Sequence, residues 1–336
     1  MRVTVIGAGV AGLACALELA ERGAEVEVLE RHTGLEGAGC SWFAGGMLAP
    51  WCELESSPPL IAELGAEAPA WWQKRFPATC VNGTLVLAYE RDAPELRQFG
   101  RRTGCFEMLQ APAIAALEPD LDGRFGRGLY FAAEGHLDPR LALAALLERL
   151  RAHAVTVRFG VEAGPAMLAG RAVLDCSGLA ARAALPGLRG VKGEMLLIRQ
   201  PEISLSRPVR VLHPRLPVYV VPRGEGTFMV GASMLESDAP RRISARSLLE
   251  LLSAAYALHP AFGEAEVLEI GTGVRAAFPD NLPRLIRRGN VLYVNGLYRH
   301  GFLLAPALAT RAAQALLEGR HFAEVMHEDP RQRRLA

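Results

Sequence analysis

The first thirty residues constrain the fold more than any other part of the chain. They contain a β-rich run at residues 2–7 (RVTVIG), a helical pattern of apolar residues at 11–23 and an alternating segment at 24–30 (AEVEVLE). The turn between the first strand and the helix carries the glycine pattern GAGVAG. A strand, such a turn, a helix and a second strand in this order form the β-α-β unit of dinucleotide-binding folds. We therefore predict an α/β chain with a Rossmann-like domain.

Each glycine of this turn has a physical reason for its position. Gly7 permits the tight turn, Gly9 lets a pyrophosphate approach the backbone, and Gly12 lets the helix pack on the sheet. The helix N-terminus adds free N–H groups and a dipole that favours an anion. Glu30, at the end of the second strand, can accept hydrogen bonds from ribose hydroxyls and would repel a 2′-phosphate. The pattern favours dinucleotide binding over a glycine-rich turn without a ligand, but it does not choose between NAD and FAD.

Composition narrows the class of ligand. The 336 residues are half apolar, which predicts a folded chain with more than one compact unit, and the net charge is +1. Such a balance argues against a broad surface for nucleic acid or for anionic membranes. The six cysteines have no CxxC spacing and the histidines have no metal-ligand spacing. We therefore expect reduced thiols in a cytoplasmic protein and no metal site.

The apolar run at residues 3–20 has a second interpretation, as a signal peptide or a membrane span. Only Arg2 precedes the run as a charged residue, and Glu18 interrupts it. Its glycines also have nucleotide-binding spacing. We therefore prefer the nucleotide-binding interpretation.

Alternation of helix and strand continues beyond the first thirty residues. An amphipathic helix at 137–153 precedes a strand at 155–160. Near the C-terminus a strand at 290–296 precedes a helix that we place at 306–319, with Pro306 in its first turn. Both ends of the chain thus have the pattern of an α/β domain.

The middle of the chain has a different character. Two extended runs, at 217–223 and 227–233, flank the sequence GEG and predict a β-hairpin. The simplest arrangement gives the two ends of the chain one discontinuous cofactor domain and the middle a second domain on an antiparallel sheet. The expected ranges are 1–55, 135–185 and 265–325 for the cofactor domain, 56–134 and 186–264 for the substrate domain, and 326–336 for a tail.

A loop at residues 40–50, CSWFAGGMLAP, has neither helical nor strand periodicity. Gly45 and Gly46 allow the backbone to approach a flat ligand closely. A ligand-free loop around a buried Met47 explains the same residues equally well.

Several long motifs resemble, in order along the chain, the D-amino-acid oxidase family of FAD-dependent amine oxidases, and most of all its glycine oxidases. The resemblance runs from Arg2 to about Leu317. The motifs are GAGVAG, VLER, CSWFAGGMLAP, VKGEMLLIR, YVVPRGEGTFMVGASM, GVRAAFPDNLPRL and GLYRHGFLLAP. This resemblance implies FAD as the cofactor, bound by a discontinuous Rossmann-like domain beside a substrate domain built on an antiparallel sheet.

The resemblance also implies which residues form the site. Glu30 would hold the adenosine ribose, segment 40–47 would line the isoalloxazine ring, and segment 297–303 would wrap its pyrimidine side. The implied FAD contacts are Gly7, Gly9, Val10, Ala11, Gly12, Glu30, Arg31, Cys40, Ser41, Gly45, Gly46, Met47, Val161, Gly178, Leu297, Tyr298, Arg299, His300, Gly301, Phe302 and Leu303. The implied substrate contacts are Arg275, Tyr219, Arg299 and Met234.

Two of these arginines lie in segments that are otherwise apolar and rich in glycine. A desolvated charge without a partner is costly, so each guanidinium needs an anion. By resemblance Arg275 grips the substrate carboxylate, which its rigid fork can bind in a bidentate way. Arg299 would face the anionic substrate and, with the positive end of the helix that follows, stabilise a reduced flavin. The alternatives are a structural ion pair for Arg275 and a surface position for Arg299.

The chain departs from the family pattern at several positions. Trp42 and Phe43 are bulky where the family often has small residues, and Leu297 and His300 stand where it often has His and Asn. The tryptophan pair at 71–72 we assign to the core and not to a ligand cage.

Together the motifs imply oxidation of a small amino acid, glycine first, to its imine, with O₂ reduced to H₂O₂. The imine would hydrolyse to glyoxylate and ammonia, or would pass to a thiazole synthase in thiamine biosynthesis. No side-chain base is needed if the neutral amine is the reactive form. The alternatives are a D-amino-acid or sarcosine oxidase, a flavin dehydrogenase with another acceptor, an NAD-dependent reductase and a non-catalytic flavoprotein. A homo-oligomer is compatible with the sequence, which does not set the oligomeric state.

Overall fold

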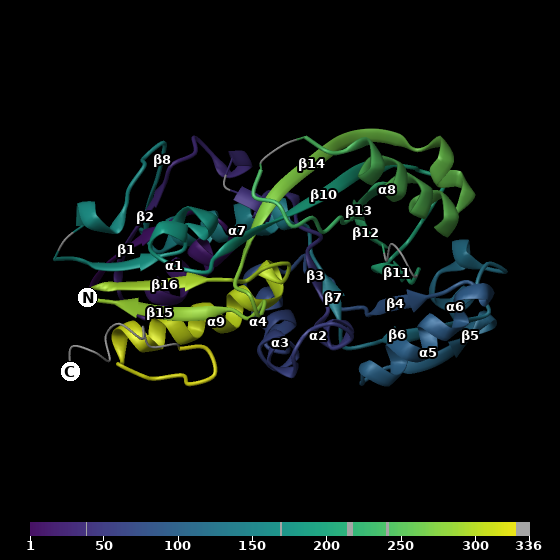
Figure 1. Ribbon diagram of the computed structural model, residues 1–336, viewed down its shortest axis with the longest axis horizontal. Helices are drawn as coiled ribbons and strands as arrows, with labels where there is room; N and C mark the ends of the chain where they lie inside the picture. The colour runs from purple at the N-terminus through teal and green to yellow at the C-terminus, as the bar shows by residue number, and fades with distance from the viewer. Residues whose placement is uncertain (38, 169, 214–217, 240–241, 327–336) are drawn as a thin grey trace.

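The computed structural model describes residues 1–37, 39–168, 170–213, 218–239 and 242–326, and Figure 1 shows two sheet-based halves side by side. Within these ranges the strands form a six-stranded sheet, an eight-stranded sheet and a two-stranded ribbon. None of the helices in the described part of the chain is both long and apolar enough to cross a membrane.

The six-stranded sheet has the N-terminal strand near its centre. Its order is β15 (Arg284–Arg288), β16 (Val291–Asn295), β9 (Ala172–Asp175), β1 (Arg2–Ile6), β2 (Glu25–Glu30) and β8 (Thr156–Phe159). All neighbours pair in parallel except β15 and β16, which are antiparallel. Three helices pack near this sheet, and α1 contacts both of the others: α1 (Val10–Glu21), α7 (Pro139–Ala152) and α9 (Gly301–Leu317). The predicted β-α-β unit and its Rossmann-like sheet are thus confirmed.

The glycine turn between β1 and α1 leaves no room for side chains. Gly7 has a φ of +97°, and a Cβ there would lie 2.8 Å from the carbonyl oxygen of Cys176. A Cβ on Gly12 would overlap the carbonyl oxygen of Gly7. The turn therefore brings helix α1 tightly against the ends of β1 and β9.

The eight-stranded sheet forms the other half of the molecule. Its order is β14 (Glu266–Ala277), β10 (Arg189–Arg199), β13 (Thr227–Gly231), β12 (Val218–Gly224), β11 (Val209–Val211), β4 (Thr84–Leu87), β6 (Arg127–Phe131) and β5 (Glu107–Gln110). Neighbouring strands are antiparallel except β11 and β4. Helix α8 (Ala245–Leu258) packs on β10, β12 and β13 over a separate apolar core. The predicted hairpin is confirmed as β12 and β13.

Strand β14 changes the expected division of the chain. It pairs with all of β10, from Arg189 to Arg199. The expectation that 265–325 lies entirely in the cofactor domain is therefore wrong for this strand, because its backbone hydrogen bonds belong to the larger sheet. The other domain ranges stay a prediction.

Short elements lie between these strands in the sequence. The ribbon consists of β3 (Met47–Leu48) and β7 (Gly135–His136). The remaining α-helices are α2 (Pro50–Glu53), α3 (Pro59–Gly65), α4 (Ala68–Arg75), α5 (Ala93–Arg102) and α6 (Ala111–Leu117). The 3₁₀ turns are η1 (Leu35–Gly37), η2 (Gly39–Phe43), η3 (Glu90–Asp92), η4 (Pro119–Leu121), η5 (Pro165–Leu168), η6 (Gly178–Ala183) and η7 (Pro260–Glu264).

Helix α9 begins at Gly301, so the predicted start at 306 is wrong. Pro306 lies inside the helix and has no N–H to donate to the carbonyl of Phe302, four residues earlier. The buried indole Nε1 of Trp72 donates to that carbonyl instead, at 2.8 Å. Trp72 therefore has a core position, as expected, and it also makes an interior proline tolerable.

Candidate cofactor and substrate site

The carboxylate of Glu30 lies beside the glycine turn. Its Oε2 accepts a hydrogen bond from the backbone N–H of Ala8 at 2.7 Å, and its Oε1 accepts one from His32 at 2.9 Å. The side chain of Glu30 is buried. Val161 donates its N–H to the Glu30 carbonyl at 2.9 Å, which places this expected FAD contact next to the expected ribose contact. Arg31 is exposed beside them.

The N-terminus of α1 faces the same region. The hydroxyl of Ser41 accepts a hydrogen bond from Val10 N–H at 3.1 Å, so the loop at 40–47 reaches the first turn of this helix. Ala11 and Gly12 follow in that turn, and Gly178 follows β9 with a φ of +60°. Together with the glycine turn, these groups fit a dinucleotide, because a helix N-terminus suits a pyrophosphate and the buried carboxylate of Glu30 beside the turn suits a ribose.

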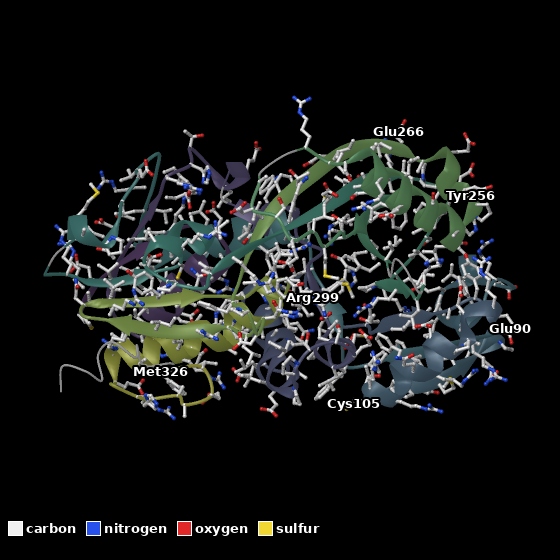
Figure 2. All side chains as sticks on the ribbon, viewed as in Figure 1. Glu90, Cys105, Tyr256, Glu266, Arg299 and Met326 are labelled. Carbon is white, nitrogen blue, oxygen red and sulfur yellow. The ribbon has the colours of Figure 1, made fainter. Side chains whose placement is uncertain are left out.

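Two adjoining cavities lie where the two halves of the molecule meet, and we call them together the central cleft. Figure 2 places Arg299 near the middle of the molecule, between the two sheets. The residues that line both cavities are Ala44, Gly45, Tyr219, Ala232, Arg275, Arg299, Gly301 and Phe302. The structure thus brings together three expected substrate contacts with expected flavin contacts from both the 40–47 and 297–303 segments.

Other predicted residues line one cavity or the other. Met47, Met234, His300 and Leu303 line the first, and Val10, Cys40, Ser41 and Tyr298 line the second. Gly46 also lines the first. Leu297 packs against the apolar core of the cofactor half instead of lining the cleft.

Arg223 of β12 holds the loop at Ala44–Gly46 in place through hydrogen bonds to its backbone. The Arg223 guanidinium donates to the carbonyls of Gly45 at 2.8 Å and Leu137 at 3.0 Å. Burial lowers the pKa of Arg223 to about 10, so it stays charged near neutral pH. Gly46 has a φ of +69°, and a Cβ there would overlap the Leu137 carbonyl. The loop conformation therefore depends on both glycine and arginine.

Arg275 projects from β14 into the cleft. Its Nη1 donates to the carbonyl of Ser233 at 3.2 Å, and no carboxylate within the described ranges forms an ion pair with it. Ser233 is fixed in turn, because its hydroxyl donates to Glu194 at 2.9 Å. Glu194 is neutralised by Lys192, at 2.7 Å. The guanidinium of Arg275 therefore has charge and hydrogen-bonding capacity left for an anion in the cleft.

Arg299 has a different environment from the one predicted. Its Nη2 lies 2.7 Å from Oε2 of Glu53 and 2.7 Å from the hydroxyl of Ser56. This pair means that Arg299 already has a carboxylate partner inside the protein, one that Arg210 shares. Its role as a substrate contact stays a prediction. Arg299 still lines both cavities of the cleft.

His300 is the residue before α9, and its imidazole is buried. Burial lowers its pKa to about 4, and the ring is therefore neutral near pH 7. Its Nδ1 lies 3.5 Å from Glu53, and its Nε2 lies 3.4 Å from the hydroxyl of Ser57. Both ring nitrogens thus have partners in the protein.

Tyr219 and Met234 stand on the substrate side. The Tyr219 ring packs against Gly45, where a Cβ would lie 2.9 Å from it. Burial raises the pKa of the Tyr219 phenol, so it remains a neutral hydrogen-bond donor. Met234 is 50% exposed, with its sulfur 3.4 Å from the hydroxyl of Tyr298. Met234 therefore lies at the mouth of the cleft.

The N-terminus of α9 closes the opposite side. The N–H of Leu304 donates to the carbonyl of His300 at 2.8 Å. The N–H groups of the first turn have no partner within a helix, and Gly301, Phe302 and Leu303 line the cleft. Their dipole favours negative charge there, as the sequence predicted for the helix that follows Arg299.

Several residues of this region escaped the sequence analysis. Glu53 and Arg210 line the first cavity, Glu194 lines the second, Gly193 makes room for Arg275, and Arg223 supports the loop. Of these residues only Arg223 had a signal that could have identified it, because it lies in the motif YVVPRGEG. The others are ordinary charged or small residues whose role depends on partners far away in the sequence.

Comparisons with known proteins agree with this geometry. Residues 2–315 match the family described as DAO, FAD dependent oxidoreductase. The chain is 56% identical over 318 residues to a protein named as the thiamine biosynthesis oxidoreductase ThiO of Rhizobium etli, covering 94% of this chain and 97% of that protein. It is 29% identical over 349 residues to the bifunctional protein ThiO/ThiG of a Nostoc species, covering 94% of this chain and 52% of that protein. A crystal structure of glycine oxidase from Geobacillus kaustophilus is similar, with a TM-score of 0.80 and 26% identity over 96% of each chain.

Proposed function

The chain belongs to the DAO family of FAD-dependent oxidoreductases, and on that premise we propose that it oxidises glycine to its imine for the thiazole branch of thiamine biosynthesis. The environment of Arg275 is the observation that supports a substrate with a carboxylate. The side chain is a guanidinium without a carboxylate partner among the described residues, and it lies in a cleft between the cofactor half and the antiparallel sheet. A small amino acid supplies the one carboxylate that this group lacks.

The residues that would hold FAD run from one end of the cofactor half to the cleft. Glu30 would bind the ribose, the turn at Gly7–Gly12 would bind the pyrophosphate, and the loop at 40–47 would flank the ring system. FAD when bound supplies the acceptor for the two electrons and the hydrogen that leave the substrate α-carbon.

The protein's own contribution is orientation. Arg275 would bind the substrate carboxylate, and the phenol of Tyr219 would add a hydrogen bond. Neither Tyr219 nor His300 is placed as a general base, since one stays protonated and the other has both ring nitrogens paired. The neutral amine of the substrate is therefore the reactive form in our proposal.

We also propose O₂ as the electron acceptor and a cytoplasmic location, the latter supported by six cysteines that form no disulfide. A thiazole synthase is the proposed recipient of the imine. This proposal is supported by the relative that is named as a bifunctional ThiO/ThiG protein. Sedimentation of the purified enzyme, alone and with a thiazole synthase, measures both the oligomeric state and this association.

One experiment tests the core of the proposal. Purified FAD-bound protein is mixed anaerobically with glycine, sarcosine, D-alanine or D-proline, and the loss of flavin absorbance is followed. We expect glycine to reduce the flavin and air to restore its colour with formation of peroxide. Flavin that no amino acid reduces would refute the enzyme activity, and reduction without peroxide under air would indicate a dehydrogenase.

A further inference from the structure

The central cleft contains more fixed cations than a single carboxylate can neutralise. Arg210, Arg275 and Arg299 all line its first cavity. The carboxylate on the same wall is that of Glu53, and the neighbouring Glu194 is paired with a lysine. The distribution of these charges therefore determines how many anionic groups a substrate can bring in.

Glu53 lies between two of these three guanidiniums. Its carboxylate lies 2.7 Å from Arg299 and 3.4 Å from Arg210, and all three side chains are largely buried. Burial alone raises the pKa of Glu53, but the attraction of Arg299, with His300 and Arg210, outweighs it and lowers the pKa to about 2. Glu53 is thus a permanent anion held between two guanidiniums inside the cleft.

Because of this pairing, the arginines of the cleft differ in how many substrate carboxylates they can bind. Arg275 can accept one carboxylate, whereas Arg299 and Arg210 already share one that belongs to the protein. A second substrate carboxylate would meet Glu53 at the same wall, and like charges at short range repel strongly in a partly dry site. We propose that Glu53 is a specificity-determining residue that occupies the place of a second substrate carboxylate and so restricts the cleft to monocarboxylic amino acids.

The inference rests on the proposed function for its substrates but can be tested without turnover. Holoenzyme is titrated with acetate and with malonate, which carry one and two carboxylates, and binding is followed by the change in flavin absorbance. The wild type should bind malonate no more tightly than acetate. Glu53→Gln keeps the shape and an acceptor oxygen but removes the charge. It should raise the affinity for malonate relative to acetate at least about tenfold, because two guanidiniums become available for charge-assisted hydrogen bonds.

Turnover provides a second measurement on the same variants. Sarcosine and iminodiacetate are both N-substituted glycines, and only the second adds a carboxylate. The ratio of kcat/KM for iminodiacetate to that for sarcosine should rise at least about tenfold in Glu53→Gln. Glu55→Gln is the matched control, since Glu55 pairs with Arg102 at 3.2 Å and does not line the cleft.

The possible results distinguish a failure of the role of Glu53 from a failure of the proposed function. A malonate-to-acetate ratio that Glu53→Gln leaves unchanged would overturn the inference, as would an equal shift in Glu55→Gln. Wild-type protein that binds malonate at least tenfold more tightly than acetate would also overturn it, and this arm needs no variant to fold. If no amino acid reduces the flavin, the proposed function fails while the titration with acetate and malonate still decides the role of Glu53.

Discussion

Replacing Gly193 by alanine should impair the proposed binding of the substrate carboxylate by Arg275, although Arg275 itself is unchanged. Gly193 lies on β10, beside the strand that carries Arg275. A Cβ on Gly193 would lie 2.6 Å from Nη1 of Arg275, with the other guanidinium atoms nearer still. Ordinary contact begins at 3.4 Å, so the guanidinium must retreat by about 1 Å. The fold should tolerate this change, because the obstructing atoms are the end of a flexible side chain.

A displacement of this size has a predictable kinetic cost. Misplacing a positioning group by about 1 Å costs on the order of 10²-fold in rate, or about 2.7 kcal/mol of transition-state stabilisation. We expect Gly193→Ala to lower kcat/KM for glycine by about that factor. Anaerobic flavin reduction by a simple alkylamine, which has no carboxylate, should change much less. Flavin content is measured alongside, because Gly193 also lines the cleft.

Two comparisons make this result interpretable. Gly263→Ala is the control, since a Cβ there meets the ring of Tyr256 at 2.9 Å, outside the cleft lining. It should leave the kinetics near wild type. The decisive comparison places Gly193→Ala in an Arg275→Ala background, where the two losses should not add. If Gly193→Ala still costs about 10²-fold there, the glycine does not act through Arg275 and the reasoning is wrong.

Four further outcomes follow from the same contacts. Arg275→Ala should weaken glycine binding by about two orders of magnitude with near-normal flavin content, and Arg275→Lys should recover only part of it, as measured by anaerobic titration. The flavin-reduction rate at subsaturating glycine should rise toward alkaline pH, and Tyr219→Phe should keep that rise because burial raises the pKa of this phenol. Arg223→Leu should lower retention of FAD on gel filtration, because the loop at 44–45 loses its donors. Burial raises the pKa of Glu134 to about 7, so the folded state binds an extra proton and the contribution of Glu134 to the free energy of unfolding should fall as pH rises from about 4.5 to about 7. Buried histidines such as His300 have lowered pKa values and act in the opposite direction in both proteins, so the quantity to measure is the free energy of unfolding of wild type minus that of Glu134→Gln, and denaturant titrations should show this difference falling across the range.

The sequence predicted the parts of this molecule whose causes are local. The β1–α1–β2 unit follows from glycine spacing and periodicity within thirty residues, and the β12–β13 hairpin follows from two extended runs around a glycine turn. The start of α9 was missed because the sequence predicts Pro306 in its first turn. In the structure the proline lies inside the helix, and the carbonyl of Phe302 receives its hydrogen bond from Trp72, 230 positions away in the sequence. Nothing near Pro306 indicates that a distant indole supplies the missing donor.

The charge pattern of the cleft was missed for a related reason. The resemblance placed Arg275 and Arg299 at the site, but it did not show that Glu53 pairs with Arg299 while Arg275 has no carboxylate partner among the described residues. Glu53 is separated from Arg210 by 157 positions, and an acidic residue after a short apolar stretch has no distinctive signal. Pairing of this kind is a property of the folded chain, because it depends on which side chains the two sheets bring into contact.

The packing of the loop at 40–47 against β14 also depends on residues that are far apart in the sequence. Phe43 stands where the family often has a small residue, and the ring lies on β14, where a Cβ on Gly271 would overlap it. At Gly273 a Cβ would lie 2.9 Å from that of Cys40. The strand therefore has glycines where the loop has larger side chains, as close packing between the two requires. Arg275 is the next position on the same face of β14. Gly271 and Gly273, which make room for Phe43 and Cys40, therefore also leave no side chains of their own beside Arg275. Loop and strand thus have to be considered together when either is changed, since a side chain at Gly271 would meet both the Phe43 ring and the sulfur of Met195, the latter at 2.6 Å, and both would have to move or become smaller.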